Sequence, residues 1–267
     1  MSASVILALL GHLWRQHRRP LLVMTAAVTL FEFLTTRLAP APEEVSWLSG
    51  LAALAPPQLV ALAGGDVAFT SPGGVIALGY THPFFLLLLG VWAVRVPSSA
   101  LAGEIGRGTM DLLAGRPVTR SQLVISTFVG FALGLTLIVF AAWTATAIGL
   151  SLRPLGVTGG RFVGVGAMAW LLFASFGAVS VLISATAREA GHAIAWTSGV
   201  IATSFVVEYL ARVWKPVAGL RPFSPFAYYR PQQIVTSGVA ASDVTRLAAL
   251  MAVAIVAAIV IFRNRDL

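Results

Sequence analysis

Long apolar stretches alternate with short polar connections along most of the chain. A bilayer core about 30 Å thick is crossed by about 20 apolar residues when they form a helix. The pattern therefore predicts six membrane-spanning helices, at about 20–38, 74–96, 122–150, 162–187, 192–212 and 244–262. We expect an all-α integral membrane protein that forms a single domain over residues 1–267.

The N-terminal residues follow a different pattern. Apolar side chains recur on one helical face of residues 3–17, while glycine, histidine, glutamine and arginine occupy the other face. This segment is too short to cross a bilayer, so we expect an amphipathic helix that lies flat at the membrane interface. Arg15, Arg18 and Arg19 follow its apolar residues, the reverse of a cleavable signal peptide, so we expect a retained N-terminus. Pro20 suits the first turn of the next span.

Two connections are longer than a simple hairpin needs. The first, 39–73, contains the apolar run Trp47–Ala55 and predicts an interfacial or partly re-entrant helix. The second, 213–243, is predicted to be an external segment. It carries four prolines and two adjacent tyrosines, which is typical of irregular or half-helical structure at an interface.

Charge and composition agree with a membrane location. Only 10% of the residues are charged, against about 25% in ordinary soluble domains. The formal charge is +8, but the basic residues are scattered near the ends of apolar segments, which favours anionic lipid over nucleic acid as their partner.

Arginines give the expected orientation. They cluster before the first span, on the connections after the second and fourth spans, and in the tail, so the positive-inside rule predicts that both termini are cytoplasmic. A single lysine among 18 basic residues is typical of a GC-rich prokaryotic genome. We therefore expect the prokaryotic cytoplasmic (inner) membrane.

Motifs of an ATPase or a metalloenzyme are missing from the sequence. A phosphate-binding loop needs lysine in the pattern GxxxxGK[ST], and the only lysine, Lys215, lies between Trp214 and Pro216. The sequence has no HExxH pair and no cysteine. We assign this chain no catalytic residue, no metal and no cofactor of its own.

The cytoplasmic connection 98–121 is unusually polar for this chain. Thr109 is placed to cap a short helix with an apolar face of Met110, Leu112 and Leu113. This stretch is either a solvated loop that obeys the positive-inside rule or a docking helix below the membrane.

Three segments of this connection resemble the signature of type-2 ABC transporter permeases between their second and third spans. They are Ala102–Glu104, Gly108–Leu113 and Arg116–Arg120. Ser224–Tyr229, the flat N-terminal helix and the tail Phe262–Leu267 resemble other parts of the same family.

The resemblance implies a permease subunit of an ATP-driven transporter that pairs with an identical copy or a paralogue. It implies two copies of a separate nucleotide-binding ATPase, which carries the ATP and magnesium. Residues 104–120 would form the main coupling helix and 187–191 a second contact. The residues expected to couple to the ATPase are Glu104, Arg107, Thr109, Met110, Asp111, Leu112, Leu113, Arg116, Arg188 and Glu189. Export is the expected direction, because no importer signature is present.

Polar residues inside spans are candidates for the substrate path, because burying them in hydrocarbon is costly. Glu32 lies near the external end of the first span, where access to headgroup water is the alternative explanation. His82 precedes Pro83 in the second predicted span, where a kink could expose backbone carbonyls and a structural histidine is the alternative.

Three residue pairs make local predictions. A capping box, a helix-end ion pair and a close helix contact are expected at Thr119 with Gln122, Glu208 with Arg212, and Gly130 with Gly134.

Two functions of other classes compete with the permease. An intramembrane enzyme acting on lipid or peptide requires facing polar residues at one membrane depth. A non-transporting membrane assembly or sensor protein requires no ATPase partner.

Overall fold

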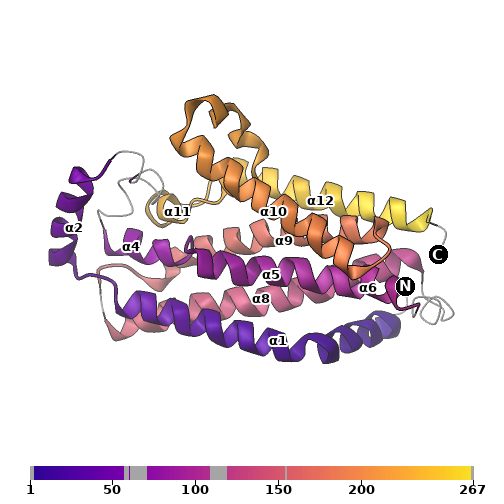
Figure 1. The fold of residues 1–267 in the computed structure, drawn as a ribbon. Coiled ribbons are helices and arrows are strands. Elements are labelled where there is room, and N and C mark those ends of the chain that lie inside the picture. Colours follow the sequence, from indigo (N-terminus) through magenta and orange to yellow (C-terminus); the bar gives the residue numbers. More distant parts are fainter. Residues whose placement is uncertain (1–2, 57–59, 61–70, 109–118, 154, 266–267) are drawn as a thin grey trace.

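The computed structural model of the chain describes residues 3–56, 60, 71–108, 119–153 and 155–265. The regular elements within these residues are all helices. The long helices run side by side along one axis, and both chain termini lie at the same end of the bundle (Figure 1). We call this end the termini end and the opposite end the far end.

The bundle contains α-helices and shorter 3-10 helices. The α-helices are α1 Ala3–Arg37, α2 Pro42–Leu54, α4 Pro72–Gly79, α5 Pro83–Ala100, α6 Ala102–Gly106, α8 Arg120–Leu152, α9 Val163–Thr186, α10 Ala190–Val213, α11 Pro231–Ser237 and α12 Ala241–Arg263. The 3-10 helices are η2 Gly159–Phe162, η3 Lys215–Phe223 and η4 Pro225–Tyr228. The predicted capping box at the start of α8 is confirmed, because Thr119 and Gln122 each accept the other's backbone N–H.

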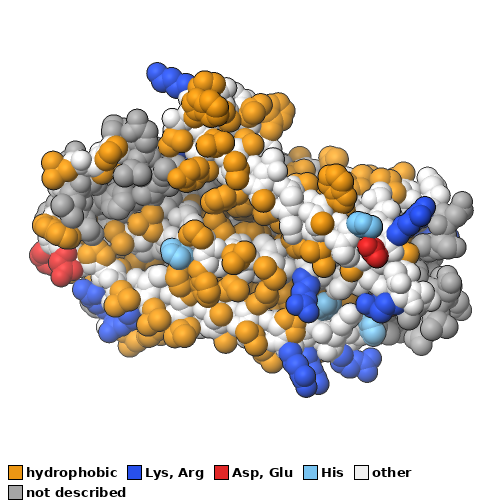
Figure 2. All heavy atoms as spheres, viewed as in Figure 1, with side chains coloured by type: hydrophobic (Ala, Val, Ile, Leu, Met, Phe, Trp, Pro, Cys, Tyr) orange, Lys and Arg blue, Asp and Glu red, His pale blue; other side chains and the backbone are white. Residues whose placement is uncertain are grey.

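Six helical segments of the described chain are long and apolar enough to cross a bilayer, which confirms the predicted number of spans. They are Leu10–Arg37, Pro83–Ala100, Arg120–Leu152, Gly159–Thr186, Ala190–Val213 and Ala241–Arg263. Figure 2 shows apolar side chains over the middle of one face, with charged side chains toward its two ends. This distribution suits helices whose middles lie in hydrocarbon.

The first helix corrects one sequence prediction. The expected separate helix at 3–17 is instead continuous with the first span, because α1 runs unbroken from Ala3 to Arg37 with Pro20 inside it. α1 bends partway along its length (Figure 1), as expected for a helix with an internal proline. Its first half packs along α8, where a Cβ added at Gly130 would lie 2.7 Å from the Leu13 side chain.

The second span begins later than predicted. In place of one helix over 74–96, the structure has α4 and α5 separated by Tyr80, Thr81 and His82. Pro83 explains the break, because proline donates no backbone hydrogen bond and disfavours helical geometry in the residue before it. His82 instead caps α5, with its Nδ1 accepting the N–H of Phe84 at 3.2 Å.

Helix α9 lies at the centre of the bundle and contacts α5, α8, α10 and α12. Its small buried residues allow close approach. A Cβ added at Gly177 would lie 2.0 Å from the Phe131 ring of α8. Phe173 and Phe176 of α9 complete an aromatic core with Phe131. Glycine and small side chains therefore set the helix spacing, as is common in membrane bundles.

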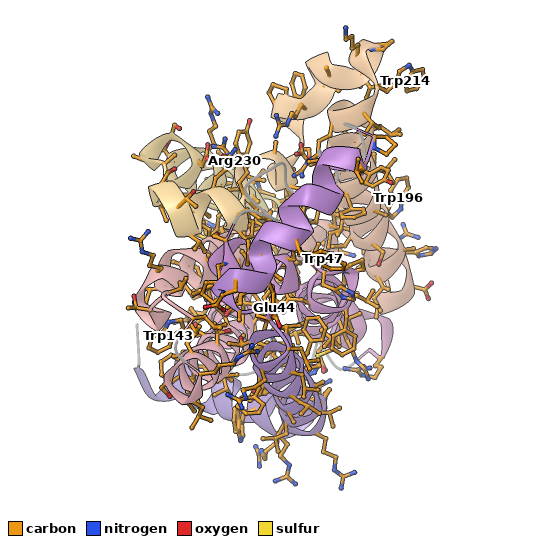
Figure 3. The ribbon with its side chains drawn as sticks, turned by 90° about the vertical axis from the view of Figure 1, so that its left-hand side faces the viewer. Glu44, Trp47, Trp143, Trp196, Trp214 and Arg230 are labelled. Carbon is orange, nitrogen blue, oxygen red and sulfur yellow. The ribbon has the colours of Figure 1, made fainter. Side chains whose placement is uncertain are left out.

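The two long connections lie at the far end. Helix α2 confirms the helix predicted around Trp47–Ala55 and crosses in front of the bundle when it is viewed from that end (Figure 3). The segment 213–243 confirms the predicted irregular structure, because η3, η4, the short α11 and the turns around them lie between the end of α10 at Val213 and the start of α12 at Ala241.

The predicted contact at Gly130 and Gly134 is present, and Gly134 offers a test of it. We expect Gly134→Ala to destabilise the protein by about 1–3 kcal/mol, because its Cβ would lie 2.2 Å from the Trp92 ring. The Trp92 indole also donates a hydrogen bond to the Phe131 carbonyl at 3.1 Å, which restricts its movement. Thermal unfolding in detergent measures the effect. Gly199→Ala is the matched control, because its Cβ would meet nothing within 4 Å. Equal melting temperatures would contradict this packing.

Candidate functional site

The coupling segment predicted at 98–121 begins at the termini end. Helix α5 passes into the short helix α6 through Leu101, which is buried in an apolar cluster with Leu123, Val181 and Phe262. Glu104 is nearly buried and forms an ion pair with Arg107. These contacts fix the start of the segment on the bundle.

Part of the predicted coupling helix lies outside the described residues. Thr109, Met110, Asp111, Leu112, Leu113 and Arg116 belong to 109–118, so their role stays a prediction.

The second predicted contact lies directly beside the first. A Cβ added at Gly106 would lie 3.2 Å from the Glu189 Cα and 3.3 Å from the Arg188 carbonyl oxygen. The Glu189 Oε1 also lies 3.2 Å from the His192 Nδ1. The structure therefore brings α6 and the connection before α10 together, although more than 80 residues separate them.

A depression of about 560 Å³ extends this junction across the start of α10. It is lined by Gly106, Ile183, Thr186, Ala187, Arg188, Glu189, His192 and Trp196. Trp196 is 70% exposed beside it. A partly polar hollow with an exposed aromatic rim is suited to receive another protein.

The C-terminal tail also lies at this end, as expected from the sequence, but its contacts with α8 and α9 were not predicted. Arg265 donates to the Ala185 carbonyl at 2.7 Å, and Arg120 donates to the carbonyls of Arg263 and Arg265. Burial and the nearby charge of Arg188 lower the pKa of Arg265. The tail's resemblance to the family ending was the only sequence signal for this contact.

A second polar site lies at the break between α4 and α5. Tyr229 donates its hydroxyl to the Tyr80 carbonyl at 3.0 Å, and Gln232 donates to the Thr81 hydroxyl at 3.2 Å. The Tyr80 hydroxyl pairs with Thr146 of α8 at 2.9 Å. The segment 213–243 therefore supplies partners for groups that the helix break leaves open.

Both predicted path residues lie at this break. Glu32 is fully buried and does not reach the surface of the isolated chain. Its Oε2 accepts from Thr35 at 3.4 Å, while its Oε1 has no hydrogen-bond partner. A Cβ added at Gly79, at the end of α4, would lie 3.0 Å from the Glu32 Oε2. The exposed His82 ring lies 5.1 Å from that of Phe31, the residue next to Glu32.

The predicted ion pair at the end of α10 is confirmed and larger than expected. Glu208 lies 2.9 Å from the Arg212 Nε, and Arg221 of η3 adds a second guanidinium at 3.2 Å. The Glu208 side chain is 5% exposed, so two arginines neutralise a buried carboxylate.

These features define a multi-pass helical membrane protein with polar groups at its two ends and at one break within the bundle. Residues 15–267 match the family described as ABC-2 family transporter protein, so the chain belongs to that family.

Over 114 residues the chain is also 32% identical to the probable ABC transporter permease protein NosY of Stutzerimonas stutzeri. That match covers 42% of the chain and 40% of the relative, so it spans less than half of either protein. The resemblance to type-2 ABC permeases is confirmed at the level of the family.

The helix break gives a second test. We expect Tyr229→Phe to destabilise the protein by about 1–3 kcal/mol, because the buried Tyr80 carbonyl loses its partner. Hydrogen exchange should quicken locally in residues 228–237. Tyr209→Phe is the matched control, since the Tyr209 ring is 46% exposed. Unchanged exchange in 228–237 would show that the hydroxyl does not hold this segment.

Proposed function

We propose that the chain forms half of the translocation path of an ATP-driven ABC exporter in the prokaryotic cytoplasmic membrane. The termini end faces the cytoplasm, where separate ATPase subunits bind. Arg107, Arg120, Arg188 and the arginines of the tail all belong to that end, which supports this orientation.

One observation carries the proposal. The two segments that resemble ATPase contacts, at Glu104–Arg107 and at Arg188–Glu189, meet across Gly106 on one face. One docking surface can include two segments this far apart in sequence only if they are in contact. Two unrelated solvated loops need not be in contact.

Each segment is attached directly to a long helix. Helix α5 leads into α6 with only Leu101 between them, and α10 begins one residue after Glu189. A contact can move a span only when it is held rigidly on it. Closure of the ATPases on ATP would then displace α5 and α10 together and alter the path beyond them.

Charged and apolar side chains have different roles at this surface. Glu104 and Arg107 orient the coupling segment through their ion pair, and Arg188 and Glu189 make the second polar contact. Met110, Leu112 and Leu113 supply the buried apolar area. The partner subunit holds ATP and magnesium, because this sequence contains no GxxxxGK[ST] loop that could bind the phosphates.

A second permease copy or a paralogue completes the path. Helix α10 carries exposed large apolar side chains along its length, including Trp196, Val206 and Tyr209. Helix α1 likewise exposes Leu22 and Val23. The exposed faces of α1 and α10 can contact lipid or a second six-span unit. A pathway between two units requires such a second unit.

The buried polar site at the helix break borders the proposed path. Glu32 is buried against the end of α4 and His82 is exposed at the start of α5, while Glu208 is engaged by Arg212 and Arg221. Membership of the ABC-2 transporter family favours the permease over the enzyme. A non-transporting assembly protein would differ from the permease by its lack of an ATPase partner.

Cysteine crosslinking tests the coupling surface. The chain has no native cysteine, so Glu189→Cys and Met110→Cys each introduce a single thiol. We expect both variants, purified from the native host, to be crosslinked to a nucleotide-binding subunit, with yields that change when ATP is added. The matched control is Gly219→Cys, in the exposed η3.

The proposal fails if no nucleotide-binding protein copurifies with the chain. It also fails if Gly219→Cys captures the ATPase as efficiently as Glu189→Cys in every nucleotide state.

A further inference from the structure

A cavity of about 160 Å³ lies between α1, α5 and α8, near the termini end. The residues that α1 contributes to its lining are Leu10, Leu13, Trp14, His17 and Leu21. Pro20, the internal proline of α1, lies between the last two of them in the sequence. A helix that bends at a proline departs from a straight packing line. The cavity therefore lies where the two halves of α1 meet.

The walls supplied by the other two helices are apolar. Trp92 and Val96 of α5 line the cavity and are 3% and 2% exposed. Leu133 of α8 lines it as well, together with Gly130 and Gly134, which have no side chains to occupy the space. Deeply buried apolar groups thus form the inner part of the cavity.

The polar groups at the cavity are engaged within the chain. The His17 Nε2 lies 3.2 Å from the Ser99 hydroxyl, and the Trp92 indole donates to the Phe131 carbonyl at 3.1 Å. A buried water makes about three hydrogen bonds to polar groups around it. A lining with one histidine among apolar residues and glycines therefore favours hydrocarbon over water.

The cavity opens toward the surface that contacts lipid. Trp14 and Leu133 line it and are also 54% and 59% exposed. Both belong to candidate membrane spans. Arg18 and Arg95, each next to a lining residue in the sequence, are exposed as well. Tryptophan and arginine near the cytoplasmic end of spans are typical of the depth where headgroups meet hydrocarbon. Acyl chains of that leaflet begin at this depth.

We propose that this cavity binds one acyl chain of a phospholipid from the leaflet at the termini end. The volume fits a single chain, because an apolar cavity of about 150 Å³ holds a benzene molecule and 160 Å³ therefore holds about six carbons. The headgroup and the rest of the lipid stay in the bilayer.

Charge favours lipid over a second copy of this chain as the occupant. Arg15, Arg18 and Arg19 of α1 and Arg95 of α5 are all exposed. Neither α5 nor the part of α1 before residue 32 contains an acidic residue. A symmetric contact at this face would bring arginines of the two copies together, and like charges repel. Phospholipid phosphates attract them instead.

The position of the cavity gives the site a consequence. The contact between His17 and Ser99 joins α1 to the end of α5, two residues before Leu101 leads into α6. An acyl chain between the same two helices fills the space through which they would otherwise approach each other. Binding itself requires no ATPase, so the site does not rest on the proposed function.

Photolabelling tests the site. The full chain is placed in phosphatidylcholine nanodiscs in which a minor fraction of the lipid carries a photoreactive group on one acyl chain. After irradiation, labelled residues are mapped by mass spectrometry. Lipid around the bundle reaches exposed residues such as Leu133, but it reaches Trp92 and Val96 only by entering the cavity. We expect label on Trp92 or Val96.

Two matched variants define the mouth of the cavity. Leu133→Trp places a larger side chain there and should lower labelling of Trp92 and Val96 about fivefold or more, because the chain is excluded. Leu137→Trp is the control, because Leu137 lies one turn further along α8, is 37% exposed and does not line the cavity. Melting temperatures in detergent check that both variants are folded.

Each result decides. Label confined to exposed residues overturns the proposal. Equal labelling of Trp92 and Val96 in the two variants, with unchanged melting temperatures, overturns it as well. Label absent from both residues, with a smaller particle mass for Leu133→Trp than for the unchanged chain in detergent, overturns it and assigns the cavity to contact with a second copy. The crosslinking test of ATPase coupling is unaffected by any of these results.

Discussion

Inside a bilayer, backbone N–H and C=O groups must find partners within the protein, because hydrocarbon offers none. The break between α4 and α5 is the place in the described chain where this constraint shapes the rest of the far end. Pro83 ends helical geometry before it, and the Tyr80 carbonyl is left without a helical partner. Tyr229 provides that partner from the segment before α11. The fold of the segment 213–243 is thus tied to one interrupted helix.

The same break explains why polar residues concentrate there. The hydroxyl groups of Tyr80 and Thr81 form hydrogen bonds with Thr146 and Gln232. Glu32 packs against the end of α4. Broken helices at membrane depth are tolerated where protein covers them or where they border a cavity. Both conditions are present, since Thr81 and Leu86 line a cavity between α5 and α10.

Two helices connect this polar far end to the termini end. α5 and α10 each start or finish at the junction around Gly106, and each borders the cavity lined by Thr81 and Leu86. The central α9, packed through small residues, contacts both of them. Close packing transmits displacement because a filled core cannot absorb it. Under the proposed function, this arrangement would connect the two membrane surfaces through α5, α10 and the α9 packed between them.

Local patterns in the sequence determined the class, the six spans, the capping box at Thr119 and the pair of Glu208 with Arg212. Each depends on residues a few positions apart, whose periodicity or spacing is sufficient. The family resemblance likewise rested on contiguous motifs, and the residues of 109–118 stay predictions. Only the tertiary structure decided that Gly106 meets Glu189, that Arg221 joins Glu208 and that Tyr229 closes the break at Tyr80. It also showed that α1 continues through Pro20. These contacts depend on how packed helices align, and no local period in the sequence encodes that alignment.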